Sequence, residues 1–271
     1  MPDAMLSESA IRDATRGGGL WTSVTVVPST GSTNADLLAA GGPEGQVLVA
    51  EEQTAGRGRM GRSWVSQPGA ALTFSMLLCP SAVPADRVDW VPLPPARVGW
   101  LPLLAGVAVA RGVREASGLP ATLKWPNDVL IDGRKLAGIL AEQSKDAVVI
   151  GVGVNVSTRL DALPSGPGGL QATSLAVEGG DVPRERLLVE ILRQFERHYT
   201  ALRKNPDPSA TGLRAEYELL CATIGKIVRV ELPAGRTQAG EATGIDADGR
   251  LLVTDAGVTT AISAGDIVHL R

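Results

Sequence analysis

Aromatic residues and cysteines are both scarce in this chain of 271 residues. Phe, Trp and Tyr make up 3% of the sequence, so a hydrophobic core must consist mainly of Val, Leu, Ile and Ala. The two cysteines, Cys79 and Cys221, form neither a disulfide framework nor a metal-binding spacing. This usage excludes a small disulfide-rich secreted protein and predicts a reducing, cytoplasmic location.

Long hydrophobic runs are also missing. The longest apolar stretch, residues 98–110, contains Pro102 and falls short of the roughly 20 residues that a membrane-spanning helix needs. It is therefore predicted to be a buried helix. The N-terminal segment MPDAMLSESAIRDATRGGG is polar and lacks the apolar core of a signal peptide. We expect no membrane association.

An excess of positive charge is absent as well. The formal net charge is -3 and the isoelectric point is about 5.5, which argues against a general nucleic-acid-binding protein. The composition is 44% hydrophobic and 20% charged, which is typical of a globular protein. The length leaves room for one large domain and a small one.

One segment departs from this acidic balance. Residues 56–62, here called the arginine loop, read GRGRMGR, and no Asp or Glu occurs between Gln53 and Ala85. The arginines therefore have no acidic partner close in the sequence, and we expect them to bind an anionic ligand. The three glycines predict a mobile loop that can close over that ligand.

Short strands and helices alternate through the first 223 residues. The hydrophobic pattern predicts strands at 21–27, 46–52, 70–78, 123–125, 129–131, 136–143 and 147–156. It predicts helices at 5–16, 32–40, 98–116, 184–204 and 208–221. Short turns between the strands favour an α+β fold with a mixed or mostly antiparallel sheet. Residues 80–95, rich in proline, are expected to form an irregular surface excursion.

The sequence changes in character after about residue 224. The segments KIVRVEL, RLLVTD, VTTAIS and DIVHL predict short strands, separated by turns such as Asp248-Gly249. They indicate a small β-barrel or sandwich. We therefore expect two domains, 1–223 and 224–271.

Three further segments bring polar groups or glycines to strand ends, where a ligand can approach the backbone: KWPNDV (124–129), KLAGIL (135–140) and GVGVNV (151–156). Each is weak evidence alone. The GxG lacks the spacing of a dinucleotide fingerprint. KWPND also fits a strand end with an Asx turn. The sequence has no P-loop motif, so any ATP must be bound in another way.

The ordered set GSTNAD, EEQTAGRGRMGRSW, KWPNDV, GRKLAGILAE, GVGVN and ATSL resembles the biotin protein ligases. The resemblance covers about residues 30–175, and the C-terminal strands fit the small SH3-like β-barrel of these enzymes. It implies a class II synthetase-like catalytic domain that forms biotinoyl-adenylate from biotin and ATP. The acyl group then passes to one lysine of a biotin carboxyl carrier domain of a biotin-dependent carboxylase. Mg²⁺ is implied as a bridge between phosphates, without assigned protein ligands.

The resemblance also implies roles for individual residues. The expected biotin-binding residues are Ser32, Thr33, Asn34, Gln53, Gly56, Arg57, Gly58, Arg59, Lys135, Gly138 and Gly153. The expected nucleotide-binding residues are Arg59, Arg62, Trp64, Asn127, Lys135 and Asn155. The expected catalytic residues are Lys135, Arg57, Arg59 and Asp128.

Lys135 is expected to contact both the biotin carboxyl group and the α-phosphate. Asp128 is expected to accept the proton of the carrier lysine or to orient it, and its alternative role is to cap the turn after Pro126. Trp64 is expected to pack over the adenine, although it also fits a core position. No general base is needed for the first step, because a carboxylate is already ionised near neutral pH.

Two other functions remain open. A lipoate or octanoate ligase is the alternative on the same fold. A non-enzymatic RNA-binding module would use the arginine loop as its contact, which predicts salt-sensitive RNA binding that the acidic composition argues against. About 20 residues precede the first predicted strand, so we expect no DNA-binding domain of the helix-turn-helix type. Monomer and weak dimer are both compatible with the sequence.

Overall fold

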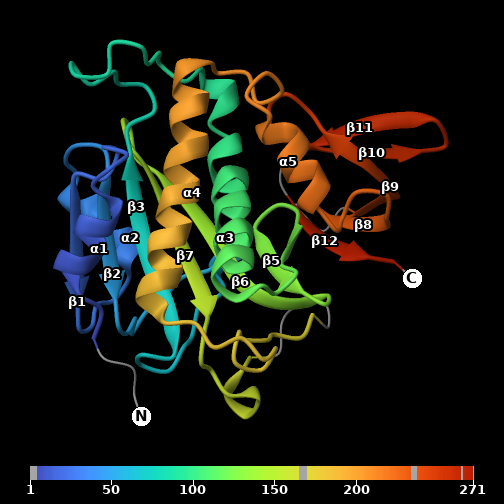
Figure 1. The fold of residues 1–271 in the computed structure, drawn as a ribbon. Helices are drawn as coiled ribbons and strands as arrows, with labels where there is room; N and C mark the ends of the chain where they lie inside the picture. Colours follow the sequence, from blue (N-terminus) through green and yellow to red (C-terminus); the bar gives the residue numbers. More distant parts are fainter. Residues whose placement is uncertain (1–4, 165–169, 233–236, 264, 271) are drawn as a thin grey trace.

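The computed structural model describes residues 5–164, 170–232, 237–263 and 265–270. Two β-sheets organise the chain (Figure 1). The strands of the first sheet are β1 (Ser23–Val27), β2 (Gln46–Ala50), β3 (Ala71–Leu78), β4 (Thr122–Lys124), β5 (Asp128–Ile131), β6 (Arg134–Gln143) and β7 (Val148–Asn155). They lie in the order β1-β2-β3-β7-β6-β5-β4. Among the described strands of this sheet, β1 and β2 are the one parallel pair, so the predicted mixed, mostly antiparallel sheet is confirmed.

Helices cover both faces of this sheet. They are α1 (Glu8–Thr15), α2 (Thr33–Ala40), α3 (Trp100–Ser117), α4 (Arg184–Lys204) and α5 (Leu213–Leu220). Figure 1 shows α3 and α4 side by side across the sheet. Leu37 of α2 packs instead against Leu48, Leu77 and Val149. These three alternate along their strands with residues of the main core, so α2 lies on the other face.

The long apolar segment forms a core helix, as the sequence predicted. By length and composition alone, Pro95–Ser117 is able to cross a membrane, but 67% of its apolar window is buried inside the protein. The last predicted helix is shorter than expected. Residues 208–211 form turns, because Gly212 adopts a positive φ of 78° immediately before α5.

The proline-rich excursion has neither helix nor strand apart from one short turn, Pro95–Arg97, that leads into α3. It is nevertheless tied to the core. Trp90 and Leu93 are buried, and the backbone of Val91 exchanges hydrogen bonds with Arg203 of α4. The guanidinium of Arg203 lies 4.6 Å from the Trp90 ring centroid and forms an ion pair with the buried Glu44. The prediction that this segment forms an irregular surface excursion is therefore wrong for Trp90, Val91 and Leu93, which pack against or bind the core.

The second sheet is called the C-terminal sheet. Its strands are β8 (Ile227–Glu231), β9 (Thr237–Ile245), β10 (Leu251–Asp255), β11 (Val258–Ile262) and β12 (Asp266–His269). They pair antiparallel in the order β11-β10-β9-β8-β12. The exact domain boundary near residue 224 stays a prediction.

Strand β9, in the middle of the C-terminal sheet, was not predicted from the sequence. Its sequence, TQAGEATGI, contains few β-branched or aromatic residues, so its intrinsic strand preference is weak. Close packing against β10 requires a glycine at one of its positions. A Cβ on Gly240 would lie 2.6 Å from the carbonyl oxygen of Thr254 in β10. Tertiary pairing therefore determines this strand more than its own residues do.

Candidate active site

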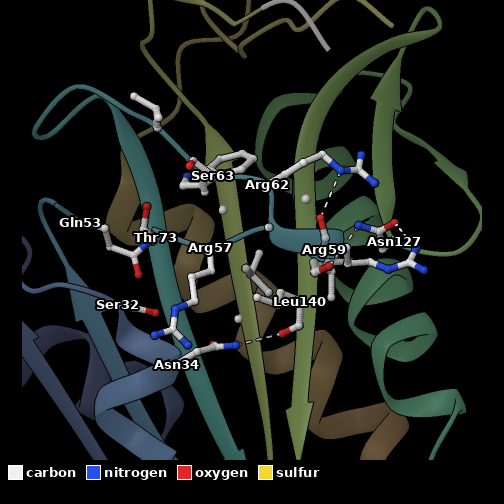
Figure 2. Close-up of a pocket in the computed structure, with 18 of the residues that line it drawn as sticks. Ser32, Asn34, Gln53, Arg57, Arg59, Arg62, Ser63, Thr73, Asn127 and Leu140 are labelled. Carbon is white, nitrogen blue, oxygen red and sulfur yellow. Dashed lines mark hydrogen bonds between the residues drawn. The ribbon is translucent and has the colours of Figure 1, made fainter. Parts of the chain in front are cut away.

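A cavity of about 440 Å³ opens on the face of the first sheet opposite α3 and α4 (Figure 2). Strand β7 explains how its floor forms. Gly151, Gly153 and Asn155 line the cavity, whereas Ile150 and Val154 alternate with them and point into the core. The motif GVGVN therefore places Gly151, Gly153 and Asn155 on the cavity face and Val154 on the buried face, while Val152 belongs to the core and also borders the cavity.

The glycines of the floor leave space for two larger side chains. A Cβ on Gly151 would lie 2.3 Å from Oδ1 of Asn34, and one on Gly153 would lie 2.3 Å from Cε2 of Trp64. Gly138 pairs with Gly153 across β6 and β7, and its Cβ would lie 3.3 Å from Cζ3 of Trp64. The indole of Trp64 thus lies directly against the glycine pair. Its predicted contact with adenine stays a prediction.

The strand register continues this row across the sheet. Lys124 pairs with Asp128, Asp128 with Gly138, Gly138 with Gly153, and Gly153 with Thr73. Burial lowers the pKa of Lys124, and the nearby charge of Asp128 opposes that shift. The row therefore runs from a charged pair on one side of the floor to a hydroxyl on the other.

One end of the cavity, the neutral end, consists of Ser32, Thr33, Asn34 and Gln53 with the buried Ser75 beneath them. Ser32 caps α2, because its hydroxyl accepts a hydrogen bond from the backbone of Ala35 at 3.4 Å. The backbone and hydroxyl of Thr33 donate to Oε1 of Gln53 at 2.8 and 3.0 Å. These contacts fix Gln53 against the helix start.

Ser75 supports the same end from β3. Its Oγ lies 2.7 Å from Oγ1 of Thr33 and 2.6 Å from Oδ1 of Asn34. The amide nitrogen of Asn34 donates to Leu140 at 3.2 Å and to Glu142 at 2.8 Å. Asn34 therefore links α2 to β3 and β6. The neutral end is a preformed hydrogen-bond network around the cavity rather than a set of independent side chains.

Four cations line the cavity: Arg57, Arg59, Arg62 and Lys135. Arg57 lies beside Asn34 of the neutral end (Figure 2), and the other three form the charged end. The described lining residues include no Asp or Glu. Three of the four cations form ion pairs with acidic residues that lie outside the cavity lining. The ion pairs are Arg57–Glu142 at 3.6 Å, Arg62–Asp266 at 2.6 Å and Lys135–Asp128 at 2.6 Å.

Arg59 is the exception at the charged end. Its guanidinium donates to the neutral Oδ1 of Asn127 at 2.9 Å, and it has no acidic partner within ion-pair distance among the described residues (Figure 2). Burial lowers the pKa of Arg59, whereas the charge of Asp266 raises it. A half-buried guanidinium without a carboxylate contact is suited to an anionic ligand.

The arginine loop is more regular than its glycines predicted. The backbone of Gly58 donates to Arg62 at 2.6 Å, and the backbone of Trp64 donates to Gly56 at 2.9 Å. Met60 (φ 56°, ψ 37°) and Gly61 (φ 73°) have the positive φ angles of a type I′ turn. The loop is therefore a small hairpin that presents Arg59 and Arg62 on either side of its turn.

Most predicted site residues meet in this cavity. Those that line it are Ser32, Thr33, Asn34, Gln53, Arg57, Gly58, Arg59, Arg62, Trp64, Asn127, Lys135, Gly138, Gly153 and Asn155. Gly56 and Asp128 do not line it. A Cβ on Gly56 would lie 2.5 Å from the carbonyl oxygen of Trp64, so this glycine permits the hairpin to close. Asp128 acts on the site through Lys135.

Four lining residues, Ile139, Leu140, Gly151 and Val152, lie in the segments KLAGIL and GVGVNV, which were predicted to approach a ligand without individual roles for these residues. Other lining residues were not predicted, namely Ser63, Val65, Thr73, Phe74, Pro164, Leu170 and Ala172. Two signals were present in the sequence. Gly151 begins GVGVN, and Thr73 and Ser75 are the polar positions of an otherwise apolar strand. Among the described residues, no group of three or more His, Cys, Asp or Glu is placed to bind a metal.

The fold and this cavity define a ligase of the biotin and lipoate class, and sequence comparison agrees. Residues 23–155 match the Biotin/lipoate A/B protein ligase family, and residues 223–270 match the Biotin protein ligase C terminal domain. The chain is 43% identical over 275 aligned residues to the biotin–[acetyl-CoA-carboxylase] ligase of Mycobacterium tuberculosis, covering 98% of this chain and 96% of that protein. The chain belongs to the biotin protein ligase family.

More distant relatives agree. The chain is 36% identical to the bifunctional ligase/repressor BirA of Bacillus subtilis, over 88% of this chain and 71% of that protein. Among solved structures, the biotin protein ligase of Aquifex aeolicus in complex with biotin and ATP superimposes with a TM-score of 0.75 at 28% identity. That match covers 93% of this chain and 100% of the other. The predicted family and fold class are confirmed.

Proposed function

We propose that this protein activates biotin with ATP and transfers it to a lysine of a biotin carboxyl carrier domain. One observation carries the proposal: a network of neutral hydrogen-bonding side chains lines one end of a single cavity, and three of the four cations in its lining, Arg59, Arg62 and Lys135, lie at the other end. Biotin has a neutral ureido head and an anionic carboxylate tail, and ATP adds further negative charge. The two ends of the cavity match the two ends of the joined substrates.

The neutral end is suited to the ureido group. That group needs both donors and acceptors, and Ser32, Thr33 and Gln53 supply hydroxyl and amide groups of both kinds. Oε1 of Gln53 already accepts two hydrogen bonds from Thr33, and its amide nitrogen makes none with the described residues. The amide nitrogen therefore remains available as a donor. A buried polar group left unpaired costs about 1–3 kcal/mol, so such contacts also discriminate against other acids.

The charged end is suited to the first half-reaction. A carboxylate oxygen of biotin attacks the α-phosphorus of ATP, an O–P bond forms, and the bond to pyrophosphate breaks. Two anions must meet, so the main requirement is fixed positive charge around the phosphoryl group. Lys135 lies at this end with its ammonium oriented by Asp128, and Arg59 contacts no carboxylate of the residues that the structure describes.

In the second half-reaction the amine of the carrier lysine attacks the acyl carbonyl, an amide bond forms, and AMP leaves. The amine must lose a proton. Asp128 was predicted to accept or orient that proton, and its 2.6 Å ion pair with Lys135 favours an orienting role. The arginine loop lies over the same cavity, where closure protects the mixed anhydride from water.

The remaining parts of the proposal rest on chemistry and on the relatives. Mg²⁺ would be bound mainly through phosphate oxygens, because the described cavity lining offers no carboxylate, and it would neutralise phosphate charge. The name of the Mycobacterium tuberculosis relative suggests that the carrier belongs to an acetyl-CoA carboxylase. A cytoplasmic location follows from the cysteine usage and stays a proposal.

Incubation of the protein with ATP, Mg²⁺, biotin and a biotin carrier domain tests this function. We expect one covalently attached biotin per carrier, detected by mass spectrometry, and none when the carrier lysine is replaced by arginine. Parallel reactions with lipoate and octanoate test the alternative ligases. Transfer of lipoate or octanoate in preference to biotin would contradict the proposal.

A further inference from the structure

The turn between β4 and β5, together with the first residue of β5, holds two of the four cations. Asn127 accepts a hydrogen bond from Arg59 at 2.9 Å, and Asp128 pairs with Lys135 at 2.6 Å. The positions of the Arg59 and Lys135 side chains therefore depend on the position of this turn. Errors of about 1 Å in such groups reduce catalytic rates severely.

The first sheet alone supports this turn weakly. Strand β4 is the last strand of the sheet and has three residues, and β5 has four. On its outer side, the described residues add one isolated bridge to β4, between Leu123 and Cys221. Asn127 is hydrogen-bonded to Ile139 of β6 at 2.9 and 3.2 Å, which anchors one side of the turn.

The C-terminal sheet supports the other side of the turn. Trp125 is 2% exposed, and its indole nitrogen donates to the carbonyl oxygen of Gly249, between β9 and β10, at 3.2 Å. The backbone nitrogen of Trp125 donates to Oγ1 of Thr223 at 3.2 Å. That hydroxyl lies 3.1 Å from Nε2 of His269 in β12. Two hydrogen-bonded routes thus connect the turn to the C-terminal sheet.

We propose that Trp125 and Thr223 are positioning residues, through which the C-terminal sheet sets where Asn127 and Asp128 hold Arg59 and Lys135. This inference rests on the proposed function. The C-terminal sheet also holds a third cation directly, because Asp266 of β12 pairs with Arg62. Arg57 and the neutral end bind to the first sheet instead. Loosening this attachment should therefore affect the use of ATP and spare the binding of biotin.

The chain offers a matched control for Trp125. Trp100 of α3 is also buried, and its indole nitrogen donates to Ala247 in the same β9–β10 turn, at 2.8 Å. Replacing either tryptophan with phenylalanine removes one N–H and keeps an aromatic ring. Both variants weaken the attachment of the C-terminal sheet, but only Trp125 lies in the turn that contains Asn127 and leads into Asp128.

The test compares W125F, W100F, T223V and T223S with the wild type. For each, biotin affinity is measured by calorimetry without ATP, and kcat and KM for ATP are measured by biotin-dependent ATP–pyrophosphate exchange. Melting temperature reports stability. We expect W125F and T223V to lower kcat/KM for ATP by about threefold to tenfold, as the loss of one or two hydrogen bonds predicts. Biotin affinity should change by less than about twofold.

The controls separate positioning from stability. W100F should lower the melting temperature at least as much as W125F does, while its kcat/KM stays near the wild-type value, and T223S should recover most of the activity that T223V loses. Equal kcat/KM for W125F and W100F would overturn the inference, and so would an unchanged T223V. A wild-type protein without biotin-dependent exchange would overturn the proposed function, and this inference with it.

Discussion

The two ends of the cavity are held in different ways. At the neutral end, Ser75, Thr33 and Asn34 bind one another across adjoining elements of the first sheet and its helix α2, at 2.6–2.7 Å. At the charged end, Arg62 and Lys135 bind carboxylates from β12 and β5. The neutral end is therefore held within the first sheet and α2. The charged end also depends on the C-terminal sheet through Asp266, so it is the end that a change in that sheet can disturb.

The largest effect should come from Lys135→Ala at the charged end. This change removes a cation next to the reacting groups and leaves Asp128 without its 2.6 Å partner. Loss of one such electrostatic contact typically costs about 10²- to 10³-fold in rate. We expect a fall of that size in biotin-dependent pyrophosphate exchange and less than about threefold in biotin affinity. Near wild-type exchange would remove Lys135 from the catalytic residues.

Arg59→Gly should have the next largest effect, on retention of the adenylate. Loss of a charge-assisted contact costs about 1.5–3 kcal/mol, or roughly 10- to 150-fold in affinity. The variant should release biotinoyl-adenylate and label lysines of a bystander protein, both measured by mass spectrometry. Arg59→Lys keeps the charge but loses the planar fork, so it should leak less. A tight, carrier-specific Arg59→Gly enzyme would show that Arg59 does not hold the intermediate.

Ser75→Ala should produce a smaller effect, confined to the neutral end. It removes the hydroxyl that lies between Thr33 and Asn34 in a fully buried position. One lost hydrogen bond of this kind costs about 1 kcal/mol, so biotin affinity should fall by about fivefold. The exchange rate at saturating biotin should stay within about twofold of the wild type. A large fall in that rate with unchanged affinity would contradict the division between the two ends.

Met60→Asn should have the smallest effect, because it changes only the turn of the arginine loop. Met60 has a positive φ of 56°, which costs about 1 kcal/mol for most side chains and less for Asn. The variant should hold the hairpin closed more often. Limited proteolysis with trypsin, which cuts after arginine, should therefore be severalfold slower at Arg57 and Arg59 than in the wild type. Faster cleavage would mean that the turn does not control loop opening.

The sequence was most informative where a local pattern determines the structure. The alternation in GVGVN predicts a strand with one permissive face, and Gly153 lies on the cavity floor as expected. The arginine loop was correctly marked as a concentration of positive charge. Its hairpin was not predicted, because the positive φ of Met60 is unusual for that residue.

Contacts between distant segments were out of reach of the sequence. Nothing local indicates that Asp266 pairs with Arg62, more than 200 residues away. Ser75 resembled an ordinary strand residue until α2 was placed over it. Strand β9 was missed for the same reason, since its pairing with β8 and β10 rather than its composition makes it a strand. Pairing with neighbouring strands can determine a strand whose own residues show little strand preference.

A double-mutant cycle with Lys135→Ala and Ser75→Ala tests the central claim most directly, that one cavity has two separately held ends. Biotin affinity and the rate of pyrophosphate exchange are measured for the wild type, both single variants and the double variant. If the ends are independent, the effects add, and the coupling energy stays below about 0.5 kcal/mol in both quantities. A coupling energy above about 1 kcal/mol would show that the two ends act as one network, which would contradict the account.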